Sequence, residues 1–253
     1  MIAGAASTQS FTGRRALLIG GSCRLALCLA DRMIAASLFP ILTYRSEAGA
    51  TRIADFLKGQ ENRYLAVYFN LSRADSLAAM LAQAENDVDY LVDFAHGELE
   101  SFIASVDEGR IDDYFLENVA CRAKLLKRVS RIMLRKKSGR LVYVSSTAAL
   151  RPNPGQGFYA AAKLASEALY RNIGIELGAR GVTAVTLRPG YVNTGRGESF
   201  LRDGGEEALR KVPIRRAVKA EEAAETIMFL LSDGARAFNA VDICLDGGLT
   251  AGK

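Results

Sequence analysis

Two hydrophobic patterns alternate along the chain. Short runs of consecutive apolar residues are typical of strands that are buried on both faces. Between them, apolar residues recur every three or four positions, which is the period of a helix with one buried side. The runs predict seven strands, over residues 15–19, 41–44, 64–69, 88–95, 141–145, 182–187 and 241–245. The helical period predicts helices over residues 25–38, 48–58, 73–84, 111–137, 158–177 and 221–231.

This alternation predicts the α/β class: one Rossmann-type, doubly wound parallel sheet of about seven strands with helices on both faces. No repeat or linker divides the chain, so residues 1–253 are expected to form a single domain. Residues 1–13 are interpreted as a loose tail. Residues 195–212 have a weak pattern and are expected to form either a mobile lid over a substrate or a helical insertion.

Composition narrows the class of protein. No apolar run approaches the roughly 20 residues that a membrane span needs, and the first residues lack the pattern of a secretory signal. We therefore expect a cytoplasmic protein with no membrane contact. The four cysteines have no zinc-type spacing, and His96 is the single histidine, so no metal site is expected.

The net charge of +5 leaves several partners open. Basic residues cluster over residues 122–140, where apolar residues keep a helical period, so we interpret this segment as a helix with a basic outer face. No aromatic residues alternate with these charges, which argues against nucleic-acid binding. A solvated helix face and a binding surface remain equally good interpretations.

Candidate chemistry lies in the segment 145–163. Tyr159 and Lys163 are four residues apart, so on a helix they share one face. A lysine charge beside a phenol lowers its pKa by roughly one to three units, and such a tyrosine can exchange a proton with a substrate oxygen. Ser146 could hydrogen-bond the same oxygen. Taken alone, this spacing is more often that of a surface helix.

Other unusual segments follow other predicted strands. Gly20 ends the first strand, residues 93–97 end the fourth, Ser146 ends the fifth and residues 189–194 end the sixth. Since ligands bind at the carboxyl ends of strands in such sheets, these segments are expected to converge on one site.

Over almost its whole length the chain resembles the short-chain dehydrogenase/reductase family. Ser146, Tyr159 and Lys163 match the family's Ser and Tyr-x-x-x-Lys, Asn118 in ENVA matches its relay Asn, and PGYVNT at 189–194 matches Pro-Gly-x-x-x-Thr. The resemblance implies hydride transfer between a nicotinamide cofactor and a carbonyl or alcohol. It implies that Tyr159 is the general acid, that Lys163 lowers its pKa and holds the nicotinamide ribose, that Ser146 orients the carbonyl, and that Asn118 holds a relay water.

Cofactor choice depends on the end of the second strand, TYRS. Arg45 stands where a ribose-binding carboxylate would select NADH, and an Arg pairs well with a 2′-phosphate. We therefore predict NADPH, with a surface Arg as the alternative. The cofactor-binding residues that the resemblance implies are Gly20, Ser22, Arg24, Tyr44, Arg45, Ala95, Tyr159, Lys163, Pro189, Gly190, Val192 and Thr194.

The cofactor-wall motifs depart from the family pattern. In the first loop, usually Gly-x-x-x-Gly-x-Gly, Arg24 replaces the second glycine, where it would either clash with the pyrophosphate or swing aside and bind it. LVDFAHG replaces a run like LVNNAG, so Asp93 stands for a structural Asn and His96 for a Gly on the cofactor wall. Asn239 and Ala240 replace the usual Thr-Gly.

Two function classes follow. One is an active NADPH-dependent reductase, and the other is a partner subunit that keeps the fold but binds cofactor weakly. The intact set Asn118, Ser146, Tyr159 and Lys163 favours the enzyme. The chain looks most like 3-oxoacyl-[acyl-carrier-protein] reductases, in which basic residues at the positions of Lys137 and Arg180 meet the acidic carrier. A small ketone, a steroid or a sugar-like alcohol remains an alternative substrate; the lid carries few bulky apolar residues (Phe200, Leu201 and Leu209), so no deep apolar pocket is expected.

The resemblance also implies an oligomer built on the helices 113–136 and 158–177. The second carries Ala160, Ala161, Ala165 and Ala168, small residues that permit close approach. We expect a homotetramer or homodimer, with a heteromer of related reductases as the alternative.

Overall fold

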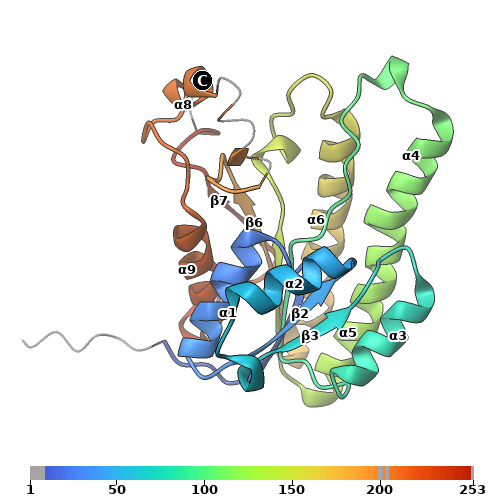
Figure 1. Cartoon of the computed structure of the whole chain (residues 1–253), viewed down its shortest axis with the longest axis vertical. Coiled ribbons are helices and arrows are strands. Elements are labelled where there is room, and N and C mark those ends of the chain that lie inside the picture. Colours follow the sequence, from blue (N-terminus) through green and yellow to red (C-terminus); the bar gives the residue numbers. More distant parts are fainter. Residues whose placement is uncertain (1–8, 196, 199–201, 203–204, 252–253) are drawn as a thin grey trace, which may run out of the picture.

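The fold is a single sheet of seven parallel strands, described from a computed structural model over residues 9–195, 197–198, 202 and 205–251. The strand order is β3-β2-β1-β4-β5-β6-β7 (Figure 1). The strands are β1 Arg15–Ile19, β2 Phe39–Tyr44, β3 Leu65–Tyr68, β4 Tyr90–Asp93, β5 Gly139–Val144, β6 Val182–Pro189 and β7 Val241–Leu245. The predicted Rossmann-type fold is confirmed, with all seven strands found and the third and fourth shorter than predicted.

Helices cover both faces of this sheet (Figure 1). They are α1 Arg24–Ala35, α2 Glu47–Phe56, α3 Ala74–Gln83, α4 Glu108–Phe115, α5 Arg122–Lys136, α6 Gly157–Leu177, α8 Glu206–Arg210 and α9 Ala220–Leu231. Residues of α1, α2 and α9 share one buried hydrophobic cluster, and residues of α3, α5 and α6 share another. The sheet is therefore buried on both sides, as its continuous apolar strands predict.

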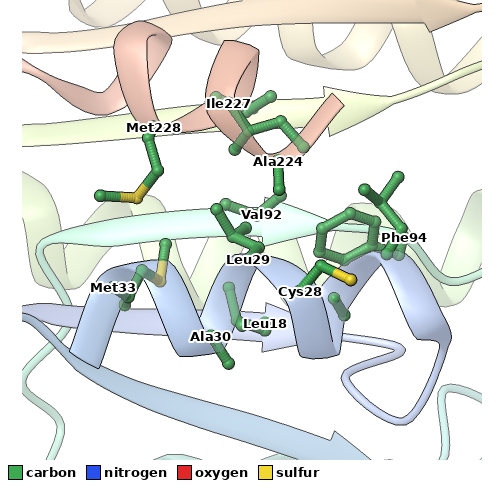
Figure 2. Close-up of a cluster of buried hydrophobic side chains, with 14 of the residues drawn as sticks. Leu18, Cys28, Leu29, Ala30, Met33, Val92, Phe94, Ala224, Ile227 and Met228 are labelled. Carbon is green, nitrogen blue, oxygen red and sulfur yellow. The ribbon is translucent and has the colours of Figure 1, made fainter. Parts of the chain in front are cut away.

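Figure 2 shows how the first cluster is built. Leu29 and Met33 of α1 point toward Val92 of β4 and toward Ile227 and Met228 of α9. α1 packs directly on the strands that end at the site. This cluster therefore fixes the position of the amino end of α1, which follows the β1 loop, at the edge of the sheet.

The segment predicted as one helix over 111–137 is divided in the structure. It begins earlier, at Glu108, because the Asp107 side chain accepts a hydrogen bond from the Arg110 N–H and caps the end. Residues Leu116–Cys121 form a π-helical turn between α4 and α5. Such turns are rare and often occur at functional sites, and this one contains Asn118.

Two peripheral segments differ from expectation. Residues 1–8 lie outside the described part of the chain, but residues 10–13 are not loose: the Asp233 N–H donates to the Ser10 carbonyl at 2.8 Å, and the Gly13 N–H donates to the Tyr90 hydroxyl at 2.7 Å. Of the predicted lid, residues 196, 199–201 and 203–204, with Phe200 and Leu201, lie outside the described residues. The rest includes α8, a short helix, in agreement with a helical insertion.

No helix in the described part of the chain is both long and apolar enough to cross a membrane.

Candidate active site

Three of the predicted catalytic side chains line one cavity at the carboxyl edge of the sheet. Ser146 follows β5, and Tyr159 and Lys163 lie one turn apart on α6. All three line a cavity of about 1050 Å³. β5 and β6 are paired in parallel, so segment 189–194 after β6 reaches the same cavity, through Pro189, Gly190, Val192 and Thr194.

The Tyr159 phenol is buried against the cavity wall, and burial raises its pKa. A hydrogen bond with Ser146 and the positive charge of Arg122 lower the pKa, but less strongly. Ser146 Oγ accepts from the Ala148 N–H at 3.1 Å, so its own proton is available for Tyr159. The sequence predicts a pKa lowered by Lys163; in the structure burial outweighs the effects that lower the pKa, although Lys163 Nζ does lie over the Tyr159 ring. A raised pKa keeps the phenol protonated near neutral pH, as a proton donor requires.

Lys163 is almost completely buried. Its Nζ donates to the Val144 carbonyl at 2.8 Å and lies over two rings, 4.9 Å from the centroid of Tyr143 and 5.7 Å from that of Tyr159. The pKa of its ammonium group is lowered to about 7, mainly by burial and also by the neighbouring charge of Arg122, while Asp93 and Glu167 oppose this. Lys163 therefore holds its proton less tightly than an exposed lysine does.

Asn118 joins the π-helical turn to the loop after β4 and does not line the cavity. Its Oδ1 accepts from the Gly97 N–H at 2.7 Å, and its Nδ2 donates to the Tyr114 carbonyl at 2.9 Å. A Cβ on Gly97 would stand 2.8 Å from Nδ2, so any side chain there would displace the Asn118 amide. The Asn118 carbonyl accepts from Arg122 and from Ser166. A relay water at Asn118 would therefore have to compete with protein donors for that carbonyl.

The cavity continues to the amino end of α1, where Cys23, Arg24 and Leu25 line it. Cys23 occupies the N-cap position without a side-chain capping bond, so the first N–H groups of this twelve-residue helix have no capping oxygen. Such an end favours phosphate. The residues present therefore fit the pyrophosphate and nicotinamide part of a dinucleotide.

Arg24 does not close this end of the cavity. Its guanidinium lies over the Phe56 ring, 4.8 Å from the centroid. Of the two outcomes that the sequence allows for Arg24, the structure has the side chain swung aside.

Other predicted cofactor residues form the turn behind the cavity. Gly20 has a φ of +74°, and a Cβ there would stand 3.0 Å from the backbone N of Ala95, so glycine is required. The Ala95 N–H donates to Asp93 Oδ1 at 3.0 Å. The Ser22 carbonyl accepts from Arg52 at 3.3 Å. Gly20, Ser22 and Ala95 shape the loops but do not line the cavity.

The end of β2 lies farther out and also does not line the cavity. Tyr44 packs edge-on against Tyr68, with ring centroids 6.2 Å apart. The Arg45 side chain is 68% exposed, and its Nη1 lies 3.7 Å from Glu117 Oε1. A 2′-phosphate at Arg45 would have to compete with this carboxylate, which the sequence did not predict.

Several residues that line the cavity have no counterpart in the sequence-based prediction. His96, noted only as a cofactor-wall substitution, packs edge-on against Tyr159 with ring centroids 5.7 Å apart. Charged side chains from segments distant in sequence also line the cavity: Glu98, Glu100, Arg151, Glu207 and Lys211. Their positions depend on how the loops and the short helix α8 are arranged, which leaves no hydrophobic pattern in the sequence.

A group of buried charges lies directly beneath the cavity. Asp93 and Arg122 form an ion pair of 2.7 Å with 0% and 1% of their side chains exposed. Glu167 and Arg188 form a second, with bonds of 2.9 and 2.5 Å. The sequence interpretation placed Arg122 on a basic outer face; that is wrong, because Arg122 lies on the buried side of α5 with Leu125, Leu126 and Val129.

Lys137 and Arg180 lie at the opposite edge of the sheet. Lys137 immediately precedes β5 and Arg180 precedes β6, at the amino ends of these strands. A Cβ on Gly181 would stand 2.3 Å from the Lys137 carbonyl, so the two turns are in contact. The cavity lies beyond the carboxyl ends of the same strands.

Comparison with known proteins assigns the family. Residues 25–250 match a family model described as enoyl-(acyl carrier protein) reductase. The chain belongs to the short-chain dehydrogenase/reductase family. The resemblance seen in the motifs is thereby confirmed, and the chain is a nicotinamide-dependent oxidoreductase that acts on C=O or CH–OH groups.

Similar proteins agree with this assignment. The 3-oxoacyl-[acyl-carrier-protein] reductase FabG of Salmonella typhimurium is 27% identical over 241 residues, 95% of this chain and 99% of the relative. A solved structure of a short chain dehydrogenase/reductase family protein is 28% identical, with a TM-score of 0.85 over 95% of this chain and 99% of that one. A gluconate 5-dehydrogenase from Burkholderia cenocepacia J2315, in complex with NADP and tartrate, shares the fold at 22% identity and a TM-score of 0.87, over 96% and 98% of the two chains.

Proposed function

We propose that this dehydrogenase/reductase uses NADPH to reduce a carbonyl to an alcohol, with a 3-oxoacyl thioester on an acyl carrier as the substrate. The observation that carries the proposal is the shared cavity: Ser146, Tyr159 and Lys163 line the same space that reaches the amino end of α1. The 27% identity to a 3-oxoacyl-[acyl-carrier-protein] reductase over almost the full length of both chains supports the substrate class.

In this proposal the protein positions the carbonyl and supplies the proton, and the bound nicotinamide supplies hydride. Ser146 donates a hydrogen bond to the substrate oxygen and holds it beside Tyr159. Tyr159 then gives its proton to that oxygen as negative charge develops there. Lys163, with a pKa near 7, holds a proton that can be passed on to Tyr159. Segment 189–194 and the amino end of α1 would hold the nicotinamide and pyrophosphate.

NADPH preference is proposed to depend on Arg45 and on its neighbour Glu117. Arg45→Ala should weaken NADPH binding roughly tenfold, because one charge-assisted bond to the 2′-phosphate is lost. NADH binding should stay almost unchanged. Glu117→Gln should have the opposite effect and tighten NADPH alone, because the carboxylate 3.7 Å from Arg45 no longer competes with phosphate. Calorimetric titration of each variant with both nucleotides measures these changes.

Equal losses for NADPH and NADH in Arg45→Ala would remove the argument for the 2′-phosphate. If the unaltered protein bound neither nucleotide, the reductase proposal itself would fail. The alternative role, a partner subunit of a related reductase, would then be the one to test.

The carrier-protein proposal makes a geometric demand. Lys137 and Arg180 lie at the amino edge of the sheet, about the length of β5 away from the cavity, roughly 20 Å. A carrier bound there would have to serve the cavity of a neighbouring subunit. We expect Lys137→Glu/Arg180→Glu to raise KM for an acyl-carrier substrate at least severalfold at low salt, while KM for a small thioester analogue stays unchanged. If the double variant changed KM for the acyl-carrier substrate no more than KM for the small analogue, these two residues would be excluded as the docking site.

A homodimer or homotetramer is proposed on the charge pattern of the long helical segment 108–136. Its first part carries exposed acidic residues at Glu108, Asp112 and Asp113, beside one exposed basic residue, Arg110. Exposed residues of its second part are basic, at Lys124, Lys127, Arg128, Arg131 and Arg135. Antiparallel pairing about a two-fold axis would match opposite charges. On α6, Ala161 and Ala168 are exposed and suit close approach, whereas Ala160 is buried in its own subunit. Sedimentation at the monomer mass would contradict this assembly.

A cytoplasmic location remains part of the same proposal.

A further inference from the structure

Arg122 is the most highly connected buried cation beneath the cavity. Its Nε donates to Asp93 at 2.7 Å, and its Nη1 donates to Ser166 Oγ at 3.2 Å. The same guanidinium donates to the carbonyls of Ala95 and Asn118. It thereby ties together the end of β4, the π-helical turn and α6, the three elements behind Tyr159 and Lys163.

Asp93, the ion-pair partner of Arg122, is held in place by two further hydrogen bonds. Tyr170 donates its hydroxyl to Asp93 Oδ2 at 3.0 Å, and the Ala95 N–H donates to Oδ1. Burial disfavours the charge of Arg122, but the charge of Asp93 and the hydrogen bond to it raise the pKa of the Arg122 guanidinium above its usual value. The site therefore contains a fixed positive charge that titrates at no physiological pH.

Lys163 lies close to the charge of Arg122 but forms no ion pair with a described carboxylate. Across the described residues, no acidic group lies within ion-pair distance of its Nζ. Both cations contact the same aromatic ring, with Arg122 at 5.4 Å and Lys163 at 4.9 Å from the Tyr143 centroid. Of these two cations, Arg122 alone forms an ion pair with Asp93, so its charge disfavours protonation of the neighbouring Lys163.

We infer that Arg122 is a positioning residue for proton transfer: its buried charge, held against the same Tyr143 ring as Lys163, controls the release of the Lys163 proton toward Tyr159. The part of this inference that concerns Tyr159 rests on the proposed function. The part that concerns Lys163 does not, because the charge state of Lys163 is a property of the folded protein alone.

The charge of Arg122 acts in the same direction on the pKa of Lys163 and on the pKa of Tyr159. The charge of Arg122 lowers the pKa of Lys163 and also that of Tyr159, while Asp93 and Glu167 raise that of Lys163. The other titratable or charged groups around this pair are Tyr143 on β5, Tyr114 on α4, Tyr170 on α6, Arg188 on β6 and His96 after β4. Each of these tyrosines has a pKa raised by burial, so all three stay neutral where Lys163 titrates.

The test follows the titration of Lys163 by nuclear magnetic resonance of protein labelled with ¹³C at lysine Cε. The Lys163 signal is the one that Lys163→Met lacks. In the unaltered protein its midpoint should lie near neutral pH. Asp93→Asn should lower the midpoint, because it removes the compensating anion. Arg122→Met should raise it by roughly one unit or more, because it removes the cation and leaves the anion.

A double variant keeps the test independent of folding. Asp93→Asn/Arg122→Met leaves no orphan charge, and its midpoint should lie above that of the unaltered protein but below that of Arg122→Met, because the effect of Arg122 exceeds that of Asp93. Tyr170→Phe is the matched control: it removes one hydrogen bond to Asp93 and changes no charge, so the midpoint should not move.

A merely structural Arg122 would give the same midpoint in every folded variant, and that result would overturn the inference. So would a Lys163 signal that does not titrate below pH 9 in the unaltered protein. In turnover assays, the alkaline limb of the pH profile should move to higher pH in the double variant, because Tyr159 loses a cation that lowers its pKa. An ordered series of midpoints without any turnover would leave the inference on Lys163 standing and contradict the proposed function.

Discussion

Tyr159→Phe is expected to lower the rate of carbonyl reduction by roughly two to four orders of magnitude, the usual contribution of a positioned general acid. The substitution removes only the hydroxyl. The ring keeps its edge-on contact with His96 and its place under Lys163, so NADPH affinity and the unfolding midpoint should change little. The measurement is NADPH oxidation with a 3-oxoacyl thioester, beside calorimetric NADPH titration.

Tyr114→Phe is the matched control for this result. Tyr114 is also a buried tyrosine near the site, and its pKa is likewise raised by burial, but it does not line the cavity. Its variant should keep most of the activity. If Tyr159→Phe kept most of the activity as well, the proton would have to come from another group and the proposed mechanism would be wrong.

Arg188→Met is expected to cost about 3–5 kcal/mol of folding free energy, the typical loss when one member of a buried ion pair is removed. Arg188 makes two bonds to Glu167, at 2.9 and 2.5 Å, and a third to Asp242 at 2.9 Å. Without Arg188, the Glu167 carboxylate stays buried, and among the described residues Ser145, at 2.6 Å, is the donor that remains. Urea unfolding followed by circular dichroism measures the loss.

Glu167→Gln/Arg188→Met should recover a large part of that stability, because no charge is then buried without a partner. Arg73→Met provides the comparison for an exposed pair: Arg73 and Asp75 are more than half exposed, so its loss of folding free energy should be much smaller than that of Arg188→Met. A loss in Arg188→Met no greater than that in Arg73→Met would mean that water reaches Glu167 and that the pair is not effectively buried.

The fold could be predicted because its signal is local and repeated. Each apolar run marks a strand buried on both faces, and each amphipathic segment marks a covering helix. The Ser146, Tyr159 and Lys163 set could be predicted for the same reason. Two residues four positions apart on a helix lie on one face, and a residue that ends a parallel strand lies at one known edge of the sheet. The π-helical turn at 116–121 could not, because it differs from an α-helix by one residue per turn and leaves the apolar spacing almost unchanged.

The buried charges were missed for a different reason. Asp93 and Arg122 belong to different elements, and their pairing depends on how α5 packs on β4. One signal was present in the sequence: Arg122 falls on the same helical stripe as Leu125, Leu126 and Val129. A charged residue on an apolar stripe needs a buried counter-charge, and Asp93, in an otherwise apolar strand, was the candidate. Arg45 and Glu117 carry no such signal, since both are at least partly exposed.

The bonding of residues 10–13 has a practical consequence for handling the protein. Ser10 and Gly13 are tied to Asp233 and Tyr90, at the amino edge of the sheet. Leu249 and Thr250, by contrast, line the cavity, and Asp246 holds the Thr250 N–H at 2.9 Å. An affinity tag or a fluorescent reporter joined ahead of residue 9 would therefore leave the cavity open, whereas one joined after residue 251 would stand at its mouth and obstruct the ligands that any binding assay sets out to measure.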